Sequence, residues 1–340
     1  MRDCEVYADC AASAPILKVA WDVVSKAYAE GWGNPNSVHT AGRDARKKLE
    51  EAREIIAHCI NAKPEEIAFT PSATAACRYA LDALQIGACS EYEHKAVYDH
   101  VYAYRRDSLE LDSHAYAHML ANNETGELFY GKVKDLSKKY TVFSDATAAV
   151  GQIPVDVQDL GVAALAAGGH KFGAFPSVGF IYVRGGVKDE DTFPGTPPVA
   201  LALAMAYALE YRTEHMKDAN AYLLKQTQFL AKDLLNIPGA YINTPPTNRL
   251  PNILSVRFDG VNARELLTML DISGVCASAG SACTADSDEP SRVLLAPGLT
   301  EEQALSTIRL SFCPESAPYE FRSVAGTLKR SVARLRELSK

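Results

Sequence analysis

The sequence lacks a hydrophobic segment long enough to span a membrane. Its most apolar run extends only from Val199 to Leu209, whereas a spanning helix needs about 20 residues. The first residues carry charges without a long apolar stretch behind them, which is not typical of a secretory signal. The net charge of −7 shows no basic excess of the kind that nucleic-acid and anionic-membrane binders carry. We therefore expect a cytoplasmic protein that binds neither nucleic acid nor membrane.

The sequence also lacks CxxC pairs, although it contains eight cysteines. In a chain of 340 residues without a secretory signal, irregularly spaced cysteines are more typical of reduced thiols than of disulfides. Structural zinc sites usually need closely spaced cysteine or histidine ligands, so we expect no metal. Most of the thiols are expected to be small apolar core residues, with at least one exception.

Helical and strand patterns alternate over the first two thirds of the chain, which favours an α/β fold with a mostly parallel sheet. Between Ser37 and Ile60, apolar residues recur at three- and four-residue steps, the pattern of an amphipathic helix. Tyr140–Ser144 and Val178–Val183 are typical of buried strands. A long helix rich in Ala and Leu is predicted from about Val199 to Leu235.

The length predicts two domains at about 150 residues each. We expect a larger α/β domain over residues 12–195. Residues 1–11 and 196–340, including the long helix, are expected to form a smaller α+β domain.

Two residues near predicted strand ends are candidates for chemistry. Lys171 lies in a turn of small residues between Gly168 and Gly173. A lysine in a crowded turn can have a lowered pKa and act as an amine nucleophile, although an ordinary solvated lysine is the alternative. Asp145 ends an apolar strand, where α/β proteins bind ligands, but it could equally be a helix N-cap.

Three further motifs have a chemical and a plain interpretation. Cys283 lies in a run of small residues, as an accessible nucleophile would, or it is an incidental thiol in a turn. The Ser72–Thr74 segment precedes a predicted helix, so it could bind a phosphate or simply cap the helix. His94 could stack on a ring and carry protons near neutral pH, or be an ordinary surface histidine.

Together these motifs resemble the cysteine desulfurases, in the class-V aminotransferase branch of the fold-type-I pyridoxal phosphate enzymes. The resemblance covers nearly the whole chain, and the matching blocks occur in the order found in that family. They are Val6–Ala12, Gly33–His39, Ala73–Thr74, Glu93–Val97, Asn122–Gly126, Asp145–Thr147, Gly169–Lys171, Gly280–Thr284 and Ile308–Ser311. The Gly-Ser-Ala-Cys block resembles the group with the longer cysteine loop. The resemblance implies a large domain with a mostly parallel seven-stranded sheet between helices, and a smaller α+β domain.

The resemblance also implies a cofactor, pyridoxal 5′-phosphate, in a homodimer. Lys171 would hold the cofactor covalently, Asp145 would pair with its ring nitrogen, and His94 would stack on its ring. The other cofactor-binding residues implied are Ala73, Thr74, Asn123, His170 and Thr196, with Thr196 lent by the other subunit.

The implied reaction converts L-cysteine to L-alanine. Arg309, helped by Asn34, would bind the substrate carboxylate, for which the forked guanidinium is suited. The catalytic residues implied are Lys171, His94 and Cys283, and the Cys283 thiolate would take the sulfur as a persulfide. An acceptor protein in iron–sulfur cluster assembly or thio-modification would receive it.

The sequence leaves two other interpretations open. One is a selenocysteine lyase or another β-eliminating enzyme of the same family. The other is a non-catalytic subunit that hands on sulfur, because Ala148 and Gly168 replace a Gln and a Ser that the family usually has. The stretch from Val187 to Phe193 is also shorter than in the family.

Overall fold

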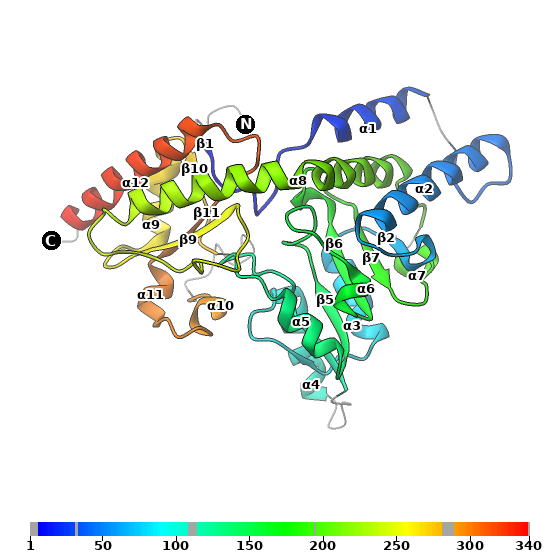
Figure 1. Ribbon diagram of the computed structural model, residues 1–340, viewed down its shortest axis with the longest axis horizontal. Helices are drawn as coiled ribbons and strands as arrows, with labels where there is room; N and C mark the ends of the chain where they lie inside the picture. The colour runs from blue at the N-terminus through cyan, green and yellow to red at the C-terminus, as the bar shows by residue number, and fades with distance from the viewer. Residues whose placement is uncertain (1–5, 31–32, 108–113, 194, 281–288, 339–340) are drawn as a thin grey trace. The chain divides into compact units, whose positions relative to one another are not determined.

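The computed structural model describes residues 6–30, 33–107, 114–193, 195–280 and 289–338 (Figure 1). The chain divides into two compact units. We call Ala14–Ala121 with Phe129–Met216 the large unit. Met1–Ser13, Asn122–Leu128 and Lys217–Lys340 form the small unit.

This division differs from the expected boundary between residues 195 and 196. Helix α8 (Val199–Leu234) is continuous. Its first half belongs to the large unit because Met205 and Arg212 lie against residues of that unit. A Cβ on Gly169 would lie 3.1 Å from the Met205 Sδ atom, and the Arg212 Nε–H donates to the Phe172 carbonyl (3.2 Å).

The segment Asn122–Leu128 joins the small unit for a similar reason. The Leu250 N–H donates to the Gly126 carbonyl (2.7 Å), and the Leu128 N–H donates to the Asn248 carbonyl (3.0 Å). These backbone bonds are long-range in sequence, so no local pattern around residue 122 could have predicted them.

A mixed sheet forms the centre of the large unit. Its strands lie in the order β2 (Ile67–Thr70), β7 (Gly179–Val183), β6 (Ala164–Gly168), β5 (Thr141–Asp145), β4 (Ala115–Ala117) and β3 (Ala88–Cys89). β7 is antiparallel to both of its neighbours, and the other neighbouring pairs are parallel. The predicted α/β fold with a mostly parallel sheet is therefore confirmed.

Among the described residues this sheet has six strands, one fewer than the resemblance implied. Helix α4 (Lys95–Asp107) precedes β4 in the chain.

Helices pack on the sheet through small and branched apolar side chains. One face is covered by α3 (Ala73–Ala83) and α4, whose buried residues form one core with Phe143 and Ile181. The amphipathic helix expected between Ser37 and Ile60 is α2 (Thr40–Cys59), which buries its apolar stripe. The remaining helices of the unit are α1 (Lys18–Glu30), η1 (Pro64–Glu66), α5 (Tyr130–Ser137), α6 (Val157–Leu160), η2 (Gly169–Lys171) and α7 (Asp189–Thr192).

The small unit combines two short sheets with helices. β11 (Thr307–Ser311), β9 (Ile253–Phe258) and β8 (Ala240–Ile242) form an antiparallel sheet, and β1 (Val6–Tyr7) pairs with β10 (Val275–Cys276) in parallel. Helices α9 (Ala263–Ile272) and α12 (Pro318–Leu338) lie side by side and share its core (Figure 1). Two short helices, α10 (Arg292–Leu295) and α11 (Glu301–Leu305), precede β11.

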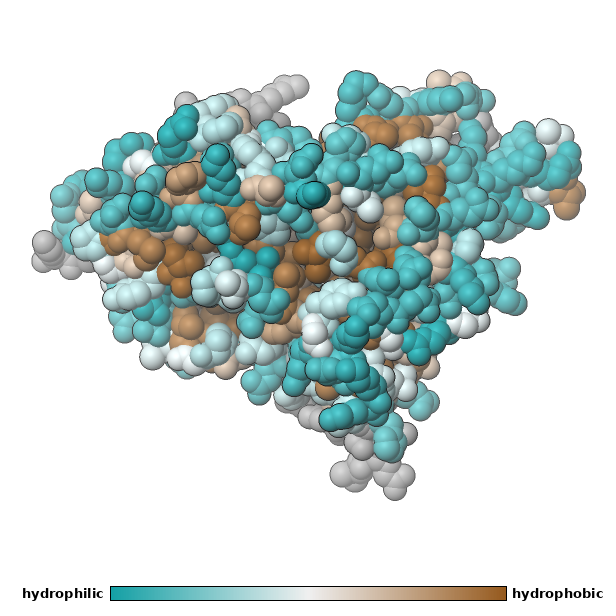
Figure 2. Space-filling view, in the orientation of Figure 1, coloured by the Kyte–Doolittle hydropathy of each residue, from teal (hydrophilic) through white to brown (hydrophobic). Residues whose placement is uncertain are grey.

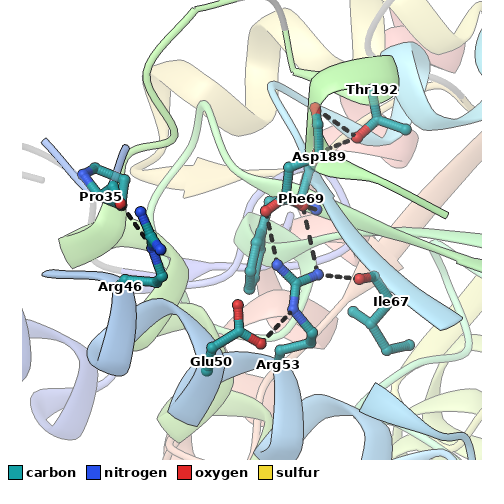
Figure 3. A network of polar contacts seen from close by, with 8 residues as sticks. All are labelled: Pro35, Arg46, Glu50, Arg53, Ile67, Phe69, Asp189 and Thr192. Atoms are coloured by element: carbon teal, nitrogen blue, oxygen red, sulfur yellow. Dashed lines mark hydrogen bonds and ion pairs between the residues drawn. The ribbon is translucent and has the colours of Figure 1, made fainter. Parts of the chain in front are cut away.

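A buried arginine joins α2, β2 and α7 in the large unit (Figure 3). Arg53 donates from Nη2 to the Asp189 carboxylate (2.7 Å), from Nε to Glu50 (3.1 Å) and from Nη1 to the Ile67 carbonyl. Its guanidinium also lies over the Phe69 ring, 5.3 Å from the ring centroid. Asp189 in turn accepts the Phe69 N–H (3.0 Å). These contacts fix α7 just before the segment that carries Thr196.

The visible face of the molecule is mostly hydrophilic, with apolar side chains gathered in patches (Figure 2). No helix among the described residues is long and apolar enough to cross a membrane.

Candidate active site

β2, β5 and β6 end at the same edge of the sheet. Gly179, at the start of the antiparallel strand β7, pairs with Thr70 on one side and Gly168 on the other. β5 is parallel to β6, so its last residue, Asp145, lies at that edge too. The carboxyl ends of parallel strands are the usual ligand-binding edge of an α/β sheet.

The start of α3 lies directly against the ends of β6 and β7, and glycine makes this approach possible. A Cβ on Gly179 would lie 3.0 Å from the Ser72 carbonyl carbon, and a Cβ on Gly168 would lie 3.1 Å from the Ala73 Cβ. The Ser72 hydroxyl caps α3 by accepting the Ala75 N–H (3.1 Å). The first turn of α3, with its outward N–H groups, is therefore placed at the sheet edge, where a phosphate can bind.

His94 lies within electrostatic reach of both Lys171 and Asp145. Lys171 ends η2, directly after β6, and His94 lies just before α4, where its Nδ1 accepts the Ala96 N–H (3.2 Å). Burial lowers the pKa of His94, the Asp145 charge opposes that shift, and the Lys171 charge adds to it. The imidazole therefore lies near both the carboxylate and the amine.

His170 and Thr74 lie on the two segments that meet beside Gly168. Burial, together with the charge of Lys171, lowers the pKa of His170 to about 4, so this ring is neutral at physiological pH. Thr74 is the second residue of α3 and is exposed. A neutral ring and a helix start are suited to hold an anion without adding another cation beside the lysine.

The Asp145 carboxylate is buried and oriented by its neighbours. It accepts the Thr147 N–H at Oδ1 (2.9 Å), and the thiol of Cys77, one turn into α3, lies within electrostatic reach of it. Cys77 is fully buried, and burial together with the Asp145 charge raises the pKa of its thiol well above the ordinary value. Sequence reasoning missed Cys77; its position one helical turn after Ala73 is a signal that could have found it.

Arg309 lies on β11 of the small unit and is almost fully buried. Its Nη2 pairs with the Asp9 carboxylate (2.7 Å), and its Nη1 donates to the Asn123 backbone carbonyl (2.9 Å). The Arg309 Nε–H is buried and has no acceptor among the described residues. A substrate carboxylate would satisfy that donor. Asp9 belongs to the Val6–Ala12 block, but sequence reasoning assigned it no role.

Asn34 and Thr196 hydrogen-bond each other in the large unit, from the Asn34 Nδ2 to the Thr196 Oγ1 (3.2 Å). Sequence reasoning gave these residues separate tasks, with Asn34 beside Arg309 and Thr196 on the cofactor of the other subunit. Their hydrogen bond joins the Gly33–His39 block to the segment after α7, and their separate tasks stay predictions.

The predicted site residues are thus distributed over both units. Those of the large unit are Asn34, Ala73, Thr74, His94, Asp145, His170, Lys171 and Thr196, and those of the small unit are Asn123 and Arg309. Cys283 lies outside the described residues. Among the described residues, no cluster of His, Cys, Asp or Glu could hold a metal ion.

The sequence profile of one family matches most of the chain. The family is described as "Aminotransferase class-V", and the matched residues are 6–101, 105–191 and 188–320. The first two matched ranges are separated within α4, and the last two overlap at residues 188–191, where α7 lies.

Named relatives match the chain over nearly its full length. "Cysteine desulfurase IscS" of Dictyoglomus turgidum is 30% identical over 379 residues, covering 98% of this chain and 96% of that protein. "IscS-like cysteine desulfurase" of Mycobacterium tuberculosis is 31% identical over 381 residues, covering 97% of each. Both alignments are longer than the 340 residues of this chain, so the relatives contain segments that this chain lacks.

Two solved structures share the fold. A "NIFS-LIKE PROTEIN" superimposes with a TM-score of 0.86 and 26% identity, covering 97% of this chain and all of that one. "SspA in complex with cysteine" superimposes with a TM-score of 0.75 and 25% identity, covering 92% of this chain and all of that one.

Proposed function

The chain belongs to the cysteine desulfurase branch of the class-V aminotransferase family, and from that premise we propose that it takes sulfur from L-cysteine and releases L-alanine. The observation that carries the proposal is the placement of Asp145 at the end of β5 and of Lys171 directly after the neighbouring parallel strand β6, with the start of α3 against the same sheet edge. A relative of similar structure is described in complex with cysteine, which supports this substrate.

The large unit fits pyridoxal 5′-phosphate on its own geometry. An amine at Lys171, a buried and oriented carboxylate at Asp145, and the glycine-dependent approach of α3 match the cofactor's aldehyde, ring nitrogen and phosphate. His94 would lie against the ring, and Ala73, Thr74 and His170 would hold the phosphate. Asn123 and a Thr196 lent by a second subunit remain proposed partners of the same cofactor. When bound, pyridoxal phosphate withdraws electrons from the substrate's α-carbon.

The surroundings of four side chains support a role for each in the proposed reaction. The Asp145 carboxylate would keep the ring nitrogen protonated, and its hydrogen bond from the Thr147 N–H orients it for that task. The Lys171 amine would move the substrate's α-proton, and the neutral His94 ring would exchange protons beside it. Arg309 would bind the substrate carboxylate through the Nε–H that has no acceptor among the described residues.

Cys283 would take the sulfur. Its thiolate forms a bond to the sulfur of L-cysteine while the bond from that sulfur to the β-carbon breaks. The electron pair of the broken bond stays with the β-carbon, which takes up a proton. The products are L-alanine and a persulfide on Cys283, and no external oxidant or reductant is needed for this step. An acceptor protein for iron–sulfur clusters or thio-modification would then receive the sulfur. We further propose that the enzyme is a cytoplasmic homodimer.

One experiment tests the function. The purified protein is reconstituted with pyridoxal phosphate, its visible absorption is recorded, and L-cysteine is added while L-alanine and persulfide are measured. We expect Lys171→Ala to lose the absorption of the covalently held cofactor. Cys283→Ser should keep that absorption but lose persulfide and L-alanine formation, while the control Cys59→Ser behaves as the wild type. Full turnover by Cys283→Ser would refute the role of Cys283, and a protein that never binds the cofactor would refute the function.

A further inference from the structure

Glu124 is a buried acid in the small unit whose backbone is held by a tight turn. The Asn122 side-chain oxygen accepts the N–H groups of Glu124 (2.8 Å) and Thr125 (2.8 Å). The turn closes with a bond from the Gly126 N–H to the Asn122 carbonyl (3.0 Å). Glu124 itself is only 6% exposed. Its carboxylate therefore has a fixed place and little access to water.

The Glu124 carboxylate contacts both flanks of the segment that carries Cys283. On the C-terminal flank, the Ser291 hydroxyl donates to Glu124 Oε2 (2.6 Å). On the N-terminal flank, a Cβ added to Gly280 would lie 2.7 Å from the same oxygen. Gly280 also has a φ of +77°, in the region that favours glycine. Gly280 and Ser291, on the two sides of the Cys283 segment, therefore both lie at this carboxylate.

The same carboxylate is linked to the substrate end of the site. Burial raises the pKa of Glu124, while the Ser291 hydrogen bond and the charges of Arg309 and Arg292 oppose that shift. Arg309 is also joined to the N-terminal flank through its backbone, because the Ser278 N–H donates to the Arg309 carbonyl (3.2 Å). The Ser278 hydroxyl then donates to the Gly280 carbonyl (3.3 Å).

We propose that Glu124 is a positioning residue for sulfur transfer, which holds both flanks of the Cys283 segment in register with Arg309, the proposed anchor of the substrate carboxylate. The inference rests on the proposed function. Burying a carboxylate is costly unless it is hydrogen-bonded and paired with cations. The Ser291 hydroxyl on one flank donates to the Glu124 carboxylate, and the charges of Arg292 and Arg309 favour the ionised form of that carboxylate.

The test compares Glu124→Gln, Ser291→Ala and Gly280→Ala in the enzyme reconstituted with pyridoxal phosphate. The matched control is Glu289→Gln, which removes the same charge from an exposed position on the same flank. We expect the three variants to lower kcat for L-alanine formation at least tenfold, because a displacement of about 1 Å between reacting groups costs up to a hundredfold. The KM for L-cysteine and the absorbance change on adding it should stay within about twofold. Ser291→Thr, which keeps the hydroxyl, should restore kcat.

A second measurement does not depend on turnover. Amide hydrogen exchange of the peptide that spans residues 278–291 should increase in Glu124→Gln and Ser291→Ala, while peptides from α9 and α12 stay unchanged. Exchange that increases throughout the small unit would overturn the proposal in favour of a purely structural acid. An unchanged kcat in Glu124→Gln, or an equal loss in Glu289→Gln, would also overturn it. A wild-type enzyme that forms no L-alanine refutes the proposed function first, and the inference with it.

Discussion

Replacing Arg53 by Met tests the buried network that holds α7. The substitution keeps most of the apolar stem but removes the guanidinium, which pairs with Asp189 and donates to the Ile67 carbonyl (Figure 3). Removing one partner of a buried ion pair costs about 3–5 kcal/mol. Asp189 keeps its bond from the Phe69 N–H, and its side chain is 16% exposed. We therefore expect a loss near the lower end, about 3 kcal/mol.

Thermal unfolding measures this loss. For domains of 150–250 residues, about 1 kcal/mol corresponds to about 2–4 °C in Tm, so Arg53→Met should lower Tm by about 6–12 °C. Arg53→Lys should fall between it and the wild type, because an ammonium cannot form the forked pair. Lys18→Met, which breaks an exposed pair with Asp22, is the control and should change Tm by less than about 2 °C.

A double-mutant cycle isolates the pair itself. If the guanidinium and the carboxylate stabilise each other, Arg53→Met should cost less in a protein that already carries Asp189→Asn. Strictly additive losses, or an Arg53→Met protein as stable as the control, would refute the reasoning. The result bears on the site because α7 immediately precedes the segment with Thr196.

Three further predictions concern the sheet edge. The pKa of His170 is about 4 in the folded protein and about 6.5 in the unfolded chain. The unfolded chain therefore binds the proton at a higher pH, so the free energy of unfolding falls as the pH decreases from 7 to 5. In urea unfolding of the cofactor-free protein, His170→Gln should reduce that fall by about 1 kcal/mol, a figure that allows for the partial exposure of the ring. An unchanged pH dependence of the unfolding free energy would contradict this prediction. Gly168→Ser should lower the free energy of unfolding by about 1 kcal/mol, because the new Cβ would lie 3.1 Å from the Ala73 Cβ. Adding Ala73→Gly should recover the lost Tm. A Gly168→Ser protein as stable as the wild type would be evidence against the contact. Cys77 is fully buried and the pKa of its thiol is raised, so iodoacetamide at pH 8 should not modify it until the protein unfolds. Mass spectrometry measures the modification. Rapid labelling of the native protein would disprove the burial of Cys77.

The sequence alone predicted the fold class and most of the elements that build the sheet edge. α2 follows from apolar periodicity, α8 from a long stretch rich in Ala and Leu, and β5 and β7 from short apolar runs, because these signals lie within one element. The structure places α8 at Val199–Leu234, within one residue of the prediction. The count of seven strands came from the resemblance, and the described residues contain six strands in this sheet.

Several site residues were also predicted before their surroundings were known. Asp145 and Lys171 lie at ends of strands, which the sequence reveals through apolar runs that stop at a charged or glycine-rich turn. Their roles as partners of a cofactor remain proposals. What the sequence could not predict is which side chains orient them, since Cys77 reaches Asp145 from a different element.

The tertiary structure decided every contact between elements that are distant in the chain. Arg53 meets Asp189, Asn34 meets Thr196, and Glu124 meets Ser291, although each pair is separated by more than a hundred residues. The physical reason is that helix and strand patterns record how a residue faces its near neighbours in the chain. Partners of buried charges are chosen by the packing of whole elements, because an unpaired charge in the interior is too costly to leave unmatched.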